Sequence, residues 1–327
     1  MKNIILIDFV PDKKWDFIEG LEEGSGEKWE VEMHDNNHFG TAFSNIKRYL
    51  GYLFSSFKLF IRRNSYKRVL AWQQFYGIFL SFFCAFFNVK KAPEITIMTF
   101  IYKPKGGFAG KIYKAFIQKA LDCRFLKRII VFSSNEVDLY SSLFNAKEGL
   151  FVFEKLGFEN IEKEVKIEDY YISAGRSNRD YEFLIRNWPS DRKLKIVCDV
   201  LNVEHSSNIE IYRNCYDDEF YELLAKSRAA VISLDNEGIS SGQLVVIQSM
   251  MFSKPVICTY NQGISDYIDD GENGILIEKR KDKLIQALCD LEKEEVYKEM
   301  SRKAYEKYTS EYSVSGMGVR IGKELCQ

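Results

Sequence analysis

The stretch from Glu237 to Cys258 predicts a loop, then a helix, then a buried strand. Its sequence is Glu237-Gly-Ile-Ser-Ser-Gly-Gln-Leu-Val-Val-Ile-Gln248-Ser-Met-Met-Phe-Ser-Lys-Pro-Val-Ile-Cys258. An apolar run of strand length, Val231 to Leu234, precedes it, and the apolar residues after the loop recur at helical spacing. Lys254-Pro255 should end the helix because proline cannot continue it, and an apolar strand follows. Strand, helix and strand in this order predict an α/β fold with a parallel sheet wrapped by helices.

The start of the predicted helix is suited to bind an anion. Ser240 or Ser241 can cap the helix, and the glycine and serines there leave backbone N–H groups facing outward. The helix dipole adds about 0.3–1 kcal/mol for a negative charge at this end. The residues expected to hold a diphosphate are Ser241, Gly242, Gln243 and Leu244. Because serine caps are common, the alternative is that Ser-Ser-Gly only caps a helix.

This stretch resembles the donor-binding segment of GT-B glycosyltransferases of family 4, also called group 1. The family pattern is a glutamate, seven residues, a second glutamate, Ala-Met-Ala, a small residue, Lys-Pro-Val and a strand. Gln248 stands at the second glutamate and Ser240 at the first, and Glu237 lies three residues early, so both carboxylates are out of register. The segment Gly263 to Ile277 is similar to the family's next helix, turn and strand. The resemblance is good over about residues 168–290 and covers the N-terminal half only in outline.

The resemblance implies the GT-B fold, an α/β architecture of two Rossmann-like domains that face each other across a cleft. We expect an acceptor-binding domain over residues 1–165, a nucleotide-sugar-binding domain over residues 166–310, and a C-terminal helix over residues 311–327 that crosses back to the first domain. A length of 327 residues is sufficient for two cores. The seven cysteines form no C-x-x-C pair, which favours reduced thiols over disulfides or a zinc site.

Two arginines follow a predicted strand in the segment Tyr170-Tyr-Ile-Ser-Ala-Gly-Arg176-Ser-Asn-Arg179. GT-B transferases carry a Gly-Arg pair and a further basic residue here, so the resemblance implies that Arg176 and Arg179 bind the donor diphosphate. The arginine fork gives phosphate two parallel hydrogen bonds, and open α/β sheets bind ligands beyond the carboxyl ends of their strands. The alternative is that Arg176 pairs with a nearby carboxylate such as Asp180.

The remaining site residues follow from the resemblance. Asn214 and Tyr216 lie in the part that contacts the nucleotide base, and Gln248 is expected near the ribose. Glu237, near the sugar, and His38, on the cleft side, are the candidate catalytic residues, although a lone histidine more often has a structural role. We expect no cofactor and no metal, because basic groups and helix N-termini hold the departing diphosphate in this family. The expected nucleotide is UDP rather than GDP.

The N-terminal half carries an uneven charge. From His38 to Arg128 there are 17 Lys or Arg against two acidic residues. The same window is rich in Phe and Tyr, and it has no RNA-binding signature, which favours an anionic membrane surface over nucleic acid as the partner. The alternative is that these cations are solvated and the aromatic residues form the core. The residues expected on this acceptor and membrane side are Arg62, Arg63, Lys103, Lys105, Lys111 and Lys114.

An uncharged run lies inside the basic window. Val69 to Val89 has 21 positions without a charged residue, so a transmembrane span is an alternative for this run. Gln73, Gln74, Gly77 and Asn88 interrupt it. They favour a strand followed by a packed helix.

The sequence therefore predicts a hexosyltransferase that moves a sugar from a nucleotide-diphosphate sugar to a lipid-linked or surface-polysaccharide acceptor. We expect metal-independent transfer with retention of the anomeric configuration, and no nucleic-acid partner. The expected location is the cytoplasm, peripheral on the inner face of the plasma membrane. The missing glutamates keep open a non-catalytic partner subunit with the GT-B fold, and an epimerase or hydrolase on the same fold is a further alternative.

Overall fold

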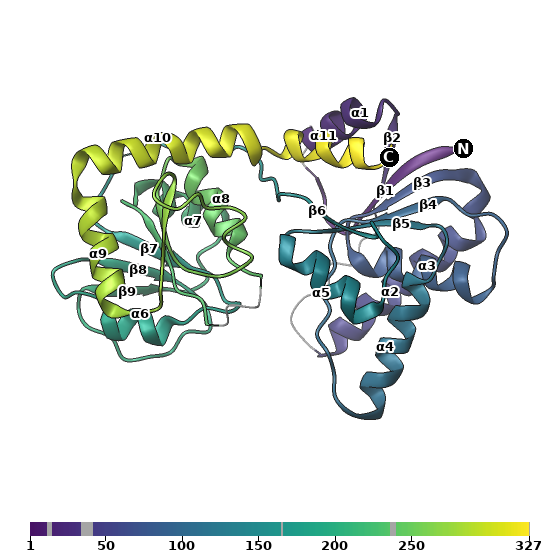
Figure 1. Ribbon diagram of the computed structural model, residues 1–327, viewed down its shortest axis with the longest axis horizontal. Helices are drawn as coiled ribbons and strands as arrows, with labels where there is room; N and C mark the ends of the chain where they lie inside the picture. The colour runs from purple at the N-terminus through teal and green to yellow at the C-terminus, as the bar shows by residue number, and fades with distance from the viewer. Residues whose placement is uncertain (12–14, 34–41, 165, 236–239, 327) are drawn as a thin grey trace. The chain divides into compact units, whose positions relative to one another are not determined.

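The computed structural model describes residues 1–11, 15–33, 42–164, 166–235 and 240–326. They form two compact units, each with its own six-stranded sheet (Figure 1). The first unit comprises Met1–Glu154 and Gly318–Gln327, and the second comprises Lys155–Met317. The chain thus changes units at Glu154, earlier than the expected boundary at residue 165, and again within its last helix.

The first sheet is entirely parallel, and its strand order is β2-β1-β3-β4-β5-β6. Its central strands are apolar and buried because helices cover both faces, as parallel sheets require. The order reverses between β1 and β3, from which the chain continues outward in the two directions. The strands are β1 (Lys2–Ile7), β2 (Trp29–Met33), β3 (Tyr66–Ala71), β4 (Glu94–Ile97), β5 (Leu126–Val131) and β6 (Phe151–Phe153).

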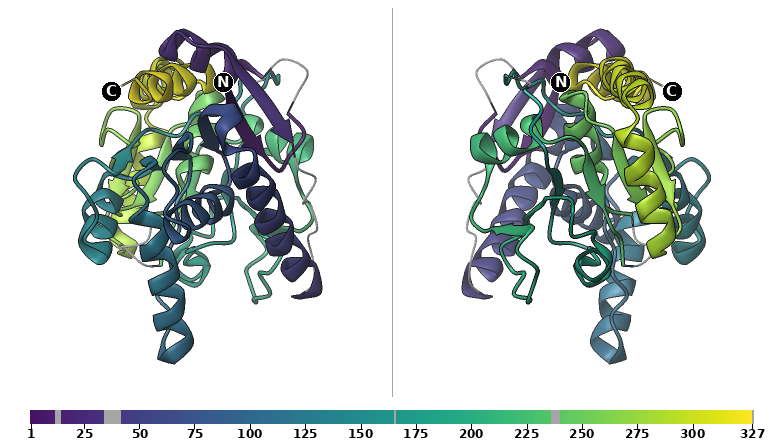
Figure 2. Two further views of the ribbon diagram at one scale, coloured as in Figure 1. Left: turned by 90° about the vertical axis from the view of Figure 1, so that its right-hand side faces the viewer. Right: turned by 90° about the vertical axis from the view of Figure 1, so that its left-hand side faces the viewer.

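Helices lie on both faces of the first sheet (Figures 1 and 2). Right-handed crossovers that run in opposite directions along a sheet place their helices on opposite faces. α1 and the last turns of α11 lie on one face, and α2 to α5 lie on the other. The helices are α1 (Asp16–Ser25), α2 (Ala42–Ile61), α3 (Gln74–Phe86), α4 (Gly107–Leu121), α5 (Ser134–Phe144) and α11 (Val314–Glu324), with a short 3-10 turn at Arg63–Ser65.

The uncharged run from Val69 to Val89 is divided between β3 and α3, as the strand-and-helix interpretation expects. α3 has 13 residues, which corresponds to a length of about 20 Å. Within the described part of the chain, no helix is both long and apolar enough to cross a membrane.

Glycines bring α1 and α11 into backbone contact. A Cβ atom on Gly318 would lie 2.4 Å from the carbonyl oxygen of Phe17, and one on Gly322 would lie 2.6 Å from the nitrogen of Ser25. Only glycine allows helices to approach this closely without a side chain between them. Arg320 Nε also donates to Glu154 Oε2 at 2.9 Å. These contacts attach the last residues of the chain to the first unit.

The second sheet is also parallel, with the strand order β12-β11-β10-β7-β8-β9. The order reverses between β7 and β10. The strands are β7 (Tyr171–Ala174), β8 (Leu194–Val197), β9 (Ile209–Tyr212), β10 (Ala230–Ile232), β11 (Val256–Thr259) and β12 (Gly274–Ile277). The helices around it are α6 (Tyr181–Asn187), α7 (Asp217–Lys226), α8 (Gln243–Met251), α9 (Lys281–Glu292) and α10 (Glu294–Glu311).

The two faces of the second sheet have separate cores. One core contains Leu184 of α6 and Leu288 of α9. The other contains Leu224 of α7, Met250 of α8 and Tyr308 of α10. The predicted succession of strand, helix and strand is confirmed as β10, α8 and β11, with the helix ending before Lys254-Pro255.

Lys254, between α8 and β11, is a buried cation. Its side chain is only 1% exposed. Among the described residues, no carboxylate or hydrogen-bond acceptor offsets this burial, which lowers the pKa of Lys254 from 10.5 to about 8. The charged form is therefore disfavoured in the folded protein.

Replacing Lys254 with methionine should stabilise the protein at pH 7. The unfolded chain keeps this proton up to about pH 10.5, whereas the folded chain loses it near pH 8. The loss of stability caused by burying the charged ammonium group is therefore fully present below about pH 8 and disappears as the pH rises to 10.5. A shift of this size corresponds to on the order of 3 kcal/mol, so we expect a gain of about 1–3 kcal/mol at pH 7 and little gain at pH 10.5.

Urea unfolding of the wild type and the Lys254→Met variant at both pH values measures this effect. Lys281→Met, at an exposed position, is the matched control and should change stability little. A Lys254→Met variant that is no more stable than the wild type at pH 7 would show that the ammonium group is compensated.

Candidate functional site

Two loops meet where the strand order of the second sheet reverses. The β7 loop, residues 175–180, and the β10 loop, here its described residues 233–235 and 240–242, lie beyond the carboxyl ends of the neighbouring strands β7 and β10. The nitrogen of Asp180 donates to Ser233 O at 2.9 Å, and the nitrogen of Asp235 donates to Asn178 O at 3.2 Å. Open α/β sheets bind their ligands at this kind of position.

Gly242 ends the β10 loop and is the N-cap of α8, with a left-handed φ of 97°. The prediction that Ser240 or Ser241 caps the helix is therefore wrong, and among the described residues no side chain caps it. The hydroxyl of Ser241 instead accepts from Asn178 Nδ2 at 3.0 Å, and that of Ser240 accepts from Gln243 Nε2. Both serines therefore fix the loop instead of covering the helix end.

The backbone N–H groups in the first turn of α8 are consequently left without a side-chain cap from any described residue. The N–H groups of residues 243–245 have no acceptor within the helix, since the first intrahelical bond runs from Val246 N to Gly242 O. They coincide with the positive end of the helix dipole. The side chain of Leu244 is exposed, whereas that of Gln243 is buried against the loop. The helix start expected to hold a diphosphate thus has the backbone geometry of an anion site.

The two arginines of the β7 loop have different surroundings. Arg179 folds back over its own loop: its Nε donates to Ala174 O at 2.8 Å and its Nη1 to Ser177 O at 2.9 Å. A Cβ atom on Gly175 would lie 2.7 Å from Arg179 Nη2, so a glycine is needed there. Burial lowers the pKa of Arg179. Arg176, by contrast, is exposed.

Asp180, the alternative partner weighed for Arg176, is engaged elsewhere. Its Oδ1 accepts from Phe183 N at 2.8 Å and caps α6, and its Oδ2 lies 3.1 Å from Lys279 Nζ. Lys279 also donates to the carbonyl oxygens of Leu234, at 3.2 Å, and Asp235, at 3.1 Å. The sequence analysis did not identify Lys279 as a residue of this site. Its position just beyond β12, at the same edge of the sheet, could have indicated it. It joins the β7 and β10 loops.

Asp199 is a second functional candidate missed from the sequence. It follows β8 and accepts hydrogen bonds from the hydroxyl of Tyr216 and from Asn214 N at 2.8 Å. These two bonds, that of Tyr216 first, hold the pKa of Asp199 below its ordinary value, and the charge of Arg176 adds to the effect. The structure therefore brings Arg176, Asn214 and Tyr216 together around one carboxylate, and the ring of Tyr216 is exposed.

Three other predicted site residues are placed differently or not described. Gln248 lies inside α8 and is only 5% exposed, within hydrogen-bonding reach of Tyr221. Glu237 and His38, the candidate catalytic residues, lie outside the described residues.

The cations predicted for the acceptor and membrane side form two groups in the first unit. Arg62 and Arg63 follow the end of α2 and precede β3, so they lie at the amino edge of the sheet. The other group is at the carboxyl edge, around the start of α4. α2 spans the distance between these edges, and its 20 residues correspond to about 30 Å. The residues of the second group are all exposed: Lys103, Lys105, Lys111 and Lys114.

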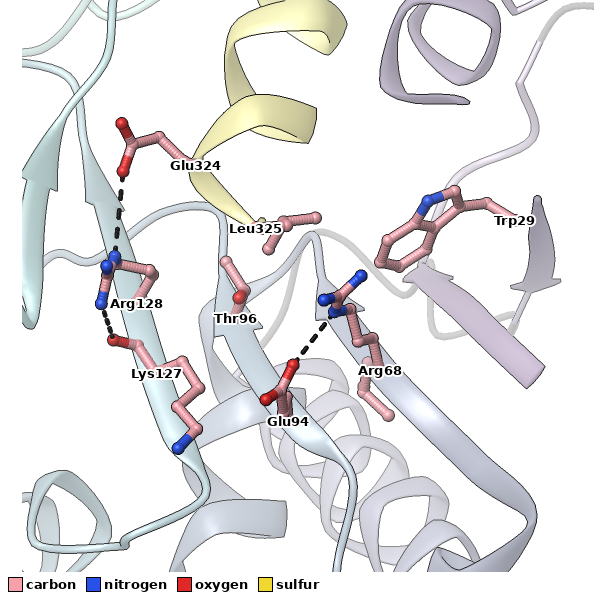
Figure 3. Close-up of a pocket in the computed structure, with 9 residues that line it drawn as sticks. Trp29, Arg68, Glu94, Thr96, Lys127, Arg128, Glu324 and Leu325 are labelled. Carbon is pink, nitrogen blue, oxygen red and sulfur yellow. Dashed lines mark hydrogen bonds and ion pairs between the residues drawn. The ribbon is translucent and has the colours of Figure 1, made fainter. Parts of the chain in front are cut away.

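A cavity of about 310 Å³ lies at the amino edge of the first sheet, against the last turn of the chain (Figure 3). The two arginines that line it form ion pairs with glutamates. Arg68 Nε donates to Glu94 Oε2 at 3.0 Å, and Arg128 Nε lies 3.8 Å from Glu324 Oε2. It contains none of the predicted site residues, and it opens at the edge opposite to the one where such sheets bind ligands. Among the described residues, no group of three or more His, Cys, Asp or Glu could hold a metal ion.

Comparison with known proteins agrees with this geometry. Residues 174–309 match the family described as glycosyl transferases group 1. An uncharacterised glycosyltransferase of Methanocaldococcus jannaschii is 30% identical over 119 residues, which are 35% of this chain and 32% of that protein. The matching segment thus spans about a third of the relative's length.

Solved structures match the whole chain. Sucrose-phosphate synthase from Thermosynechococcus elongatus superposes with a TM-score of 0.68 at 12% identity, over 99% of this chain and 98% of that one. Anabaena HepE, solved in complex with UDP and glucose, superposes with a TM-score of 0.66 at 11% identity, over 99% of each chain. At such low identity these matches show the fold alone, and they confirm the GT-B fold expected from the sequence. The chain has the GT-B fold of two Rossmann-like units, and the segment 174–309, within its second unit, is similar to the glycosyl transferases of group 1.

Proposed function

We propose that this protein is a glycosyltransferase that uses a nucleotide-diphosphate sugar, with UDP as the nucleotide, bound by the second unit. The observation that carries the proposal is the start of α8, which no described side chain caps and which is joined through Ser241 and Asn178 to the loop that carries the exposed Arg176. A diphosphate there would accept hydrogen bonds from backbone N–H groups and from one guanidinium group. The exposed ring of Tyr216 offers an apolar surface for the base, and Asp199 holds that ring in place.

The same groups account for the proposed reaction. When the bond between sugar and phosphate breaks, negative charge develops on the departing diphosphate. The α8 N-terminus and Arg176 stabilise that charge without a metal, because they are already oriented before the reaction begins. Glu237 and His38 remain the proposed catalytic residues, and retention of the anomeric configuration remains part of the proposal. The UDP and glucose bound to the Anabaena structure support this choice of donor.

A second candidate function is a non-catalytic subunit that binds a nucleotide sugar. It is favoured by Gln248, whose buried amide stands where the family pattern has a carboxylate. The two functions differ in turnover and not in binding. Release of UDP from a UDP-sugar, with an acceptor or water, identifies the enzyme, whereas binding without release identifies the subunit.

Replacing Arg176 with alanine should weaken UDP binding about tenfold or more, because a hydrogen bond to a charged group contributes about 1.5–3 kcal/mol. Isothermal titration calorimetry with UDP, GDP and UMP measures this, and UDP should bind best in the wild type. Arg186→Ala, an exposed arginine on α6 that pairs with Glu182, is the matched control. Equal UDP affinity for the wild type and the Arg176→Ala variant would remove Arg176 from the site.

We further propose that the first unit binds an anionic membrane from the cytoplasmic side and takes a lipid-linked or surface-polysaccharide acceptor there. The outer face of α2 supports this proposal. Five apolar side chains at helical spacing along α2 are between 41 and 62% exposed, and α2 contains no acidic residue. These five residues, here called the α2 stripe, are Ile46, Leu50, Phe54, Phe57 and Ile61.

The surroundings of the α2 stripe also suit a bilayer surface. Phe86 and Phe87 at the end of α3 are exposed beside it, and the ring of Phe87 lies 5.4 Å from that of Phe60. Lys47 and Lys58 flank the stripe and are exposed. A helix with an apolar face and basic flanks lies in the plane of the membrane interface, with the apolar face among the acyl chains. Each lysine near an anionic surface adds about 1 kcal/mol.

Changing Phe54, Phe57 and Ile61 together to serine should reduce binding to vesicles of phosphatidylglycerol and phosphatidylcholine at least tenfold. Fully burying one such side chain is worth about 1.5–3 kcal/mol. The loss of three such side chains should therefore reduce membrane binding by more than a factor of ten. Vesicle flotation at low and high salt measures it. Leu139→Ser, an exposed leucine on α5, is the control and should bind like the wild type. If the triple variant floats as well as the wild type, the α2 stripe is not the membrane surface.

A further inference from the structure

The first sheet reverses its strand order between β1 and β3, as the second does between β7 and β10. Open α/β sheets bind ligands where their strand order reverses, and the donor is assigned to the reversal in the second sheet. The same rule predicts a ligand at the reversal in the first sheet. The nitrogen of Trp72 donates to Leu6 O at 3.0 Å, so the chain leaves β1 and β3 side by side at this point. Asp8 follows β1 directly and Gln73 lies two residues beyond β3, so both lie at the carboxyl ends of these neighbouring strands.

Asp8 is held in a fixed orientation by a buried phenol. The hydroxyl of Tyr52, on α2, donates to Asp8 Oδ2 at 2.6 Å, and Tyr52 is almost completely buried. Burial and the hydrogen bond to Asp8 raise the pKa of Tyr52, so it remains a donor. Within the described part of the chain, Asp8 Oδ1 accepts no hydrogen bond, and the Asp8 side chain is partly exposed. One carboxylate oxygen is thus positioned and available.

Gln73 supplies the complementary group. Its Oε1 accepts from Phe75 N at 2.6 Å and caps α3, which fixes the side-chain amide. No described residue accepts from its Nε2, so this donor is available at the same edge of the sheet as the Asp8 acceptor. Tyr49 adds an apolar wall on the same side of the sheet: its ring is exposed and packs edge-on against Phe75 at 4.8 Å.

We infer that Asp8, Gln73 and Tyr49 form a subsite for a neutral sugar ring of the acceptor. A fixed carboxylate oxygen and a fixed amide N–H on neighbouring strands match two adjacent hydroxyl groups, one donating and one accepting. The exposed face of Tyr49 matches the apolar face of a pyranose ring. The choice of a sugar rests on the proposed glycosyl transfer, whereas the placement rests on the strand order and the side chains.

Saturation-transfer NMR on the full chain tests the subsite with three probes: methyl α-D-glucopyranoside, methyl α-D-galactopyranoside and methyl N-acetyl-β-D-glucosaminide. At least one probe should receive saturation from the wild type. Asp8→Asn keeps an oxygen for Tyr52 and removes the free acceptor, and Gln73→Glu keeps the cap on α3 and removes the donor. Each variant should reduce the transfer fivefold or more. Asp138→Asn, an exposed aspartate on α5, should leave it unchanged.

The outcomes separate this inference from the proposed function. Undiminished transfer in both variants, or no transfer to any probe in the wild type, would overturn the subsite. Calorimetry with UDP on the Asp8→Asn variant should give the wild-type affinity. If UDP fails to bind the wild type while a pyranoside still binds through Asp8 and Gln73, the donor proposal fails and the sugar subsite stands.

Discussion

The left-handed backbone of Gly242 is the constraint on which the carboxyl edge of the second sheet depends. A φ of 97° turns the chain into α8 at Gly242, and the helix begins with N–H groups that no described side chain caps. Any L side chain there would be strained by roughly 1–2 kcal/mol, because φ is positive. The turn is fixed from both sides, by Asn178 through Ser241 and by Lys279 through the start of the loop.

The two edges of each sheet have different chemistry. At the amino edge of the first sheet, charged side chains are paired with one another, as Arg68 is with Glu94 in the cavity of Figure 3. At the carboxyl edges, positioned groups remain for a ligand: the α8 N-terminus and Arg176 in the second unit, and Asp8 with Gln73 in the first. α2 connects two of the proposals, because it carries Tyr52, which orients Asp8, and also the α2 stripe. An acceptor sugar bound at Asp8 would thus lie near the middle of the helix proposed to rest on the membrane.

The sequence was sufficient to predict elements governed by local patterns. β10, α8 and β11 follow from an apolar run, helical spacing and a proline, all of which act within a few residues. Capping was predicted wrongly because the serine preference is local, whereas Asn178, from the β7 loop, engages Ser241 in the fold. Asp199 and Lys279 were missed for a similar reason: each joins the site only because the sheet aligns the ends of strands that are distant in sequence.

Charge counting had a comparable limit. It identified a basic window. It could not show that Arg62 and Arg63 lie at one end of α2, whereas the lysines around α4 lie at the level of the other end. A count of charges does not say where in the fold the charges lie. It also did not identify the α2 stripe as a surface, since the same aromatic residues would be expected in a core. Burial separates the two cases: Tyr52 is inside and Phe54, two residues later on the same helix, is outside.

Hydrogen–deuterium exchange with and without saturating UDP examines the donor assignment at the level of single peptides. If the diphosphate binds the backbone at the start of α8 beside Arg176, exchange should slow in peptides covering residues 241–249 and 174–180. Exchange should remain unchanged in a peptide covering residues 124–131, at the amino edge of the first sheet. Protection of the amino-edge peptide in place of the α8 peptide, or no protection near α8 while calorimetry shows UDP bound, would contradict the account.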